Sequence, residues 1–174
     1  MRWPGAEWGP VRVPRGVSLG HLDRPLALLE AEKAVSKHQP LGPRKPGWMK
    51  IKAETELLNG YPDSAIADLT QALQNHSDSV HLQLLLAIAY ARRGDLSSDR
   101  ASFERALQWI NKVLQEEPAN SVALFDRALI YQRLEMFDES IADFTKVRQS
   151  DLDPKWADEA ARKLSTLDRG HEEK

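Results

Sequence analysis

Three segments of this chain repeat one helical pattern, and this repetition constrains the fold more than any other feature. In each segment a small or apolar residue recurs every three or four positions, as at Ala65, Leu69 and Ala72. This spacing gives a helix one apolar face, which must be buried against another helix. Repetition of this kind is typical of proteins that stack copies of one small unit. The aligned segments are 64–79, 105–121 and 139–154.

A further helix precedes each of these segments. Asn59-Gly60 and Gly94-Asp95 are typical helix stops, and Pro62 is suited to open the next helix. The expected first helices are therefore 50–58, 80–93 and 121–134. The pattern predicts three helix–turn–helix units, at 46–79, 80–120 and 121–154. The outer units have 34 residues each, and the middle unit has 41 because 96–102 is expected to be an insertion.

The residues expected at the helix contacts carry a resemblance to a known family. In the two later units the first helix has a small residue followed by an aromatic, namely Ala87 with Tyr90 and Ala128 with Tyr131. Aromatic residues open the second helices, small residues follow three places on, and prolines close the units. These residues are Phe103 and Phe137, then Ala65, Ala106 and Ser140, then Pro118 and Pro154. In this pattern 46–154 resembles the tetratricopeptide repeat (TPR) family, and 46–79 departs from it where Glu56 replaces the aromatic.

The resemblance implies an all-α fold. The expected architecture is a right-handed TPR-type helical solenoid of about three helix–turn–helix repeats plus a C-terminal capping helix. Small residues let neighbouring helices approach closely, and the aromatics fill the space beside them.

The segments outside the three units differ from them in composition. We expect 155–168 to form the capping helix, because Trp156, Ala160 and Leu164 fall on one face and the charged residues lie elsewhere. Proline and glycine dominate the start of the chain and predict irregular structure there. The predicted organisation is a disordered or irregular arm at 1–24, a partial repeat helix and linker at 25–45, the TPR domain at 46–168 and a frayed tail at 169–174.

Composition and motifs argue against catalysis. The chain has no cysteine, which excludes thiolate nucleophiles, disulfides and cysteine-ligated metals. The sequence contains no glycine-rich phosphate-binding loop and no nucleophile-elbow motif. His76 and His81 flank an expected turn, but two histidines alone make a poor zinc site. We therefore expect no enzyme activity, no catalytic residue, no metal and no cofactor.

The charge of the chain argues against nucleic acid and membranes as general partners. The net charge is −2, whereas nucleic-acid-binding domains usually carry a clear basic excess. Residues 1–46 hold eight Lys/Arg and four Asp/Glu, a charge of +4, and the rest holds sixteen and twenty-two, a charge of −6. The longest apolar run, near Leu84–Ala91, is too short to cross a bilayer. We expect a cytoplasmic protein whose partner is another protein or peptide.

The TPR resemblance also implies where a partner binds. Members of this family use the inner face of the first helices as a groove, which holds a peptide or helix by a few anchor residues. In this chain the candidate contact residues of that groove are Leu84, Ile88, Arg92, Phe125, Leu129, Gln132 and Arg133.

One binding mode of the family does not fit these positions. Some members clamp a terminal carboxylate with lysine and asparagine side chains. Glu54 and Leu85 stand where asparagines are needed, and the basic pair is replaced by Val122 and Asp126. A carboxylate would meet too little positive charge, so we expect no such clamp. The remaining apolar strip predicts an amphipathic helix or an extended apolar peptide as the ligand. The alternative is that the strip is covered by 25–38, by the N-terminal arm or by a second copy of the chain.

Two function classes are left open by these observations. The first is a free-standing scaffold or adaptor. The second is a sensing or docking arm of a larger enzyme, because 123–147 and 151–167 resemble the TPR segment before the CHAT peptidase domain of some bacterial proteins. That domain uses a His/Cys pair, and this chain has no cysteine, so no catalytic residue is carried over.

Overall fold

The computed structural model describes residues 26–37, 46–149 and 154–172, and these residues form eight α-helices without a strand. Their bounds are α1 Leu26–Lys37, α2 Pro46–Leu58, α3 Pro62–Asn75, α4 Val80–Ser97, α5 Arg100–Glu116, α6 Ser121–Arg133, α7 Phe137–Gln149 and α8 Pro154–Glu172. The all-α prediction is confirmed for this part of the chain. The arm at 1–24 and most of the linker, 38–45, lie outside the described residues.

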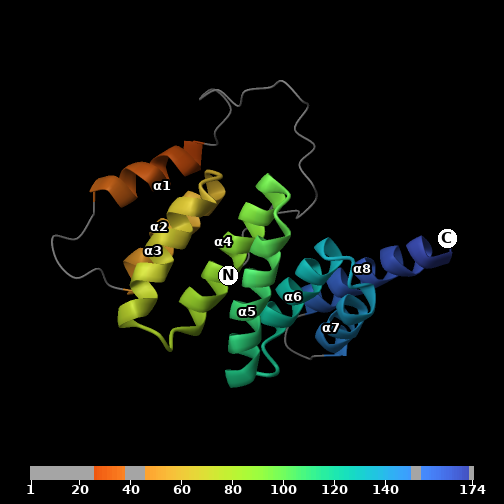
Figure 1. Ribbon diagram of the computed structural model, residues 1–174. Helices are drawn as coiled ribbons and strands as arrows, with labels where there is room; N and C mark the ends of the chain where they lie inside the picture. Colours follow the sequence, from red (N-terminus) through yellow and green to blue (C-terminus); the bar gives the residue numbers. More distant parts are fainter. Residues whose placement is uncertain (1–25, 38–45, 150–153, 173–174) are drawn as a thin grey trace.

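The helices follow one another through the molecule in chain order (Figure 1). Every helix packs against the next one in the sequence, from α1 against α2 to α7 against α8. Short turns join α2 to α3 and α6 to α7, so both pairs are compact hairpins. Contacts also link α2 to α4 and α4 to α6. The first helices of successive hairpins, α2, α4 and α6, therefore contact one another in turn.

Small residues occupy the closest helix contacts. Ala65, Ala87, Ala106 and Ala128, all singled out by the repeat, are each 0% exposed. Ser140 fills the equivalent position on α7, and its hydroxyl donates a hydrogen bond of 2.9 Å to the carbonyl oxygen of Ala128. A larger side chain at these points would force the helices apart. The core falls into two clusters, one centred on α2–α4 and one on α4–α8.

The middle unit differs from the prediction. Gly94 does not end the first helix, because α4 continues to Ser97 and α5 begins at Arg100. The expected insertion is thus largely taken up as longer helices. Gly94 is buried, and a Cβ atom there would lie 2.9 Å from the Phe103 ring. Glycine is required at this position because α5 approaches closely, and the chain turns only at Ser98, which has a positive φ of 53°.

Side-chain caps define where the later helices start. Asp99 accepts a hydrogen bond of 3.0 Å from the backbone N–H of Ala101 at the start of α5. Asn120 accepts one of 3.0 Å from the backbone N–H of Ala123 at the start of α6. Each cap contributes about 1 kcal/mol to helix stability. At the C-terminus the helix is longer than predicted, because α8 includes 169–172, which were expected to be part of a frayed tail.

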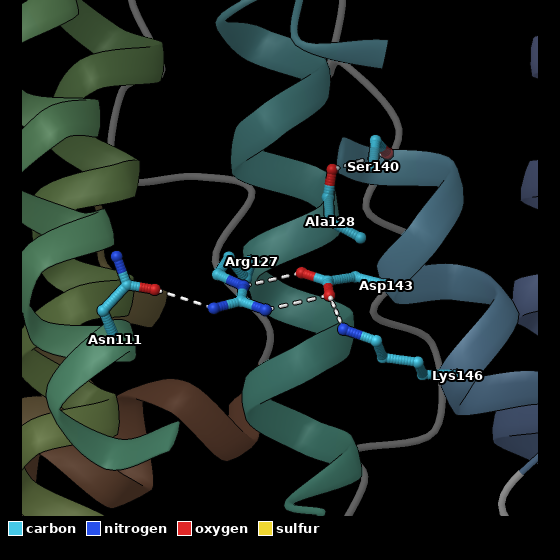
Figure 2. Close-up of polar contacts among 6 residues, drawn as sticks. All are labelled: Asn111, Arg127, Ala128, Ser140, Asp143 and Lys146. Atoms are coloured by element: carbon cyan, nitrogen blue, oxygen red, sulfur yellow. Dashed lines mark hydrogen bonds and ion pairs between the residues drawn. The ribbon is translucent and has the colours of Figure 1, made fainter. Parts of the chain in front are cut away.

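A polar network ties α5, α6 and α7 together (Figure 2). The Arg127 guanidinium donates two hydrogen bonds to the Asp143 carboxylate, at 2.6 Å and 2.9 Å. Its third contact is a bond of 2.8 Å to the side-chain oxygen of Asn111. Asp143 is 2% exposed, and Lys146 approaches it at 3.5 Å. The hydrogen bond to Asp143 raises the pKa of Arg127 above its usual value, so the pair favours the charged guanidinium.

Candidate binding cavity between α4, α5, α6 and α8

A cavity of about 50 Å³ opens where α4 and α6 approach each other, beside α5 and α8. Its apolar wall includes Ile88 from α4, Ile110 from α5, and Leu129 and Ile130 from α6. Ile110 and Ile130 are buried in the core, whereas Ile88 and Leu129 are partly exposed. The cavity therefore has a fixed core floor and a mouth lined by accessible apolar side chains. We call it the α4–α6 cavity.

Helical spacing explains why α6 contributes more lining residues than any other helix. Asp126, Leu129, Ile130 and Arg133 occupy positions i, i+3, i+4 and i+7, which form one stripe along the helix. On α4 the lining residues Ile88, Ala91 and Asp95 follow the same rule. The cavity is thus bounded by one face of each helix.

Three charged residues besides Asp126 line the cavity. Arg133 donates a hydrogen bond of 2.7 Å from its Nε to the Asp95 carboxylate and forms an ion pair with it. This pair joins the C-terminal parts of α4 and α6, and its two charges neutralise each other. Lys163 comes from α8, and no ion pair to it is found among the described residues. The cavity therefore contains one neutralised pair and one cation.

Asp126 is the group that distinguishes this cavity chemically. Its side chain is partly buried and lines the apolar wall. Burial raises the pKa of Asp126 to about 7, and within the described residues no hydrogen bond or opposite charge counteracts this effect. The carboxyl group thus changes its charge close to neutral pH, whereas an exposed aspartate is ionised there.

Four of the seven predicted groove residues line the α4–α6 cavity, namely Ile88, Leu129, Gln132 and Arg133. Leu84 and Arg92 are partly exposed on α4 but do not contribute to it. Phe125 is placed differently from the prediction. It is 3% exposed and packs edge-on against Phe144 of α7, with ring centroids 5.3 Å apart. This aromatic contact fills the core, so Phe125 does not offer its side chain to a ligand.

Sequence reasoning did not identify Asp126 or Lys163 as site residues. Asp126 was considered only as the replacement of a basic residue in a carboxylate clamp. The sequence did contain one signal for Asp126. It is a polar residue on the same helical stripe as Leu129 and Arg133. Lys163 gave no signal, because its position depends on how α8 packs against the preceding hairpin.

A second cavity, of about 280 Å³, adjoins the Asp95–Arg133 pair. It shares Asp95, Phe103 and Arg133 with the first cavity, and its remaining lining includes Gly94 and Arg100. The ion pair therefore contributes to the lining of both cavities.

No group of three or more His, Cys, Asp or Glu residues that is suited to a metal ion occurs within 26–37, 46–149 and 154–172. Over these residues, none of the helices has both the length and the apolar character needed to cross a membrane. No protein-family model and no curated protein matches the sequence.

Proposed function

We propose that this chain is a protein-interaction module of the TPR type, a helical solenoid that holds a segment of another protein against α4 and α6. The observation that carries the proposal is the α4–α6 cavity, where four residues predicted to contact a ligand come together. The repeated small residues, the paired helices and the contacts between alternate helices support the solenoid architecture. A module that binds a segment of another protein and catalyses no reaction serves as a scaffold or adaptor.

The size of the cavity favours a polypeptide ligand over a small molecule. Sites for drug-sized molecules typically enclose about 300–1,000 Å³. A cavity of about 50 Å³ accepts only the tip of one side chain. The rest of such a ligand must lie across the surface outside the cavity, where Leu84 and Arg92 are partly exposed. A peptide or helix with one inserted anchor residue has this shape.

A displayed library of random peptides, selected on the immobilised chain, tests this proposal. Peptides that bind at α4 and α6 should lose about tenfold or more in affinity on Leu129→Ala, because truncation removes the accessible apolar wall. Leu58→Ala is the matched control, since Leu58 is 50% exposed on α2 and lies outside the cavity. If both variants bind the selected peptides as well as the unchanged chain does, the partner site is not at α4 and α6.

A further inference from the structure

We infer that the α4–α6 cavity is a receptor for a lysine side chain of the partner, with the Asp126 carboxylate binding the ammonium group. This inference rests on the proposed function and specifies its anchor. The partner is therefore a protein segment that carries a basic residue beside apolar ones, rather than a purely apolar peptide.

The first support is the missing counter-charge. A buried carboxylate is normally paired or hydrogen-bonded, because burial without a partner destabilises the folded chain. Asp143, on the next hairpin helix, follows this rule and is held by Arg127 at 2.6 Å. Asp126 has no such partner among the described residues, although it lines an apolar wall. A group that is costly in the free protein and accessible from a cavity is suited to a charged ligand group.

The second support is the shape and chemistry of the wall. About 10–15 Å³ of such volume holds one water molecule, so a cavity of about 50 Å³ accepts a short chain of several atoms. Lysine has a narrow aliphatic stem that packs along apolar surface and ends in a compact ammonium group. Ile88 and Leu129 supply the apolar surface at the mouth. A bulky aromatic anchor would not enter a space of this size.

The third support is the balance of charge around Asp126. From α4 the facing charged group is Asp95, which is neutralised by Arg133 of α6 at 2.7 Å. The α5 residues in the lining, Phe103 and Ile110, are uncharged. From α8 the facing group is Lys163, which competes with an incoming cation. The Asp126 carboxylate is thus the one lining anion, among the described residues, whose charge is not already paired.

Two small probes test the lysine receptor directly. N-acetyl-lysine methylamide carries the proposed anchor, and N-acetyl-norleucine methylamide has the same stem without the charge. Binding is followed by the NMR shifts of the Ile88 and Leu129 methyl groups in the full chain. Affinity for one side chain is weak, so dissociation constants on the order of millimolar are expected. The lysine probe should bind about tenfold more tightly than the norleucine probe at about pH 8.

Variants test whether Asp126 is responsible for the preference for the lysine probe. Asp126→Asn should reduce the affinity for the lysine probe about tenfold and leave the norleucine probe unchanged. Asp78→Asn, at an exposed aspartate outside the cavity, is the matched control and should change neither. Lys163→Met should strengthen lysine binding a few-fold, because it removes the competing cation. The affinity of the unchanged chain should fall about tenfold from about pH 8 to about pH 6, because Asp126 becomes protonated.

Two results would overturn the lysine receptor. One is the absence of methyl shifts with the lysine probe at concentrations on the order of tens of millimolar. The other is equal binding of both probes, or equal binding to the unchanged chain and to Asp126→Asn. Selected peptides that depend on Leu129 but need no lysine would also overturn it, while the proposed function would stand. Peptides whose affinity is unchanged by Leu129→Ala would count against the proposed function. The lysine and norleucine probes would still show whether the cavity binds a lysine side chain.

Discussion

Two adjacent residues of α6, Asp126 and Arg127, lie in opposite kinds of environment. Arg127 points toward α5 and α7, where Asn111 and Asp143 accept its hydrogen bonds (Figure 2). Asp126 lines the α4–α6 cavity, where no partner offsets its burial among the described residues. The two environments show that charged side chains serve two different purposes in this protein. The paired charges of Arg127 and Asp143 hold helices in place, and a carboxylate without a partner among the described residues is available to a ligand.

The comparison predicts its largest effect at Asp143. Asp143→Ala should lower the free energy of unfolding by about 3–5 kcal/mol, because Arg127 would keep a charge without its counter-ion between α5, α6 and α7. Urea unfolding followed by circular dichroism measures this change. Asp138→Ala, at an exposed position on the same helix, should lower the free energy by much less. Equal losses in the two variants would show that the network has no special role.

At Asp126, in contrast, removing the charge is expected to raise the free energy of unfolding. Its folded-state pKa of about 7 lies above the ordinary aspartate value of 3.8, so between these two pH values the folded chain holds a proton that the unfolded chain has released. Its contribution to stability therefore falls as pH rises from about 4 to about 7 and stays low above that. Asp126→Asn should raise the free energy of unfolding by about 1–3 kcal/mol at about pH 8 and change it little at about pH 4. Urea unfolding at both pH values measures this difference. A destabilised variant at about pH 8 would mean that Asp126 has a stabilising partner.

The smallest effect is expected for the ion pair at the end of the cavity. The side chains of Arg133 and Asp95 are 41% and 26% exposed, so water screens their attraction. Asp95→Asn should lower the free energy of unfolding by about 0.2–1 kcal/mol, and the loss should shrink at high salt. Thermal unfolding at low and high ionic strength provides the measurement. A loss as large as that of Asp143→Ala would remove the distinction between a core network and a rim pair.

Much of the secondary structure was predictable from local signals. The small residues Ala65, Ala87, Ala106 and Ala128 marked the helix contacts, and all four are fully buried. Gly60 ends α2 with a positive φ of 77°, as a glycine at a helix end predicts. Gly94 carries the same local signal but lies inside α4, because its role is to admit the Phe103 ring. A glycine that ends a helix and one that allows close packing look identical in a sequence.

The candidate site was predictable only in part. The resemblance to TPR proteins assigned Ile88, Leu129, Gln132 and Arg133 to the groove, and they line the cavity. Phe125 was assigned to the same surface, but its side chain is buried in the core, where it packs against the Phe144 ring. The stripe of a helix that faces a groove and the stripe that faces the core are neighbours on α6. Helical spacing fixes which residues share a stripe, and it does not fix which way each stripe points.

The order of the helices and the small residues at their contacts could be predicted from the sequence, because both follow from periodicity and from side-chain volume along a single helix. Only the packed structure shows that Asp126 is partly buried and has no partner among the described residues, while Arg127 is paired with Asp143 and Asn111. Burial and pairing depend on atoms brought in by α4, α5, α7 and α8, which are distant in the sequence. The property that suggests what this protein binds therefore arises only when the helices are packed together.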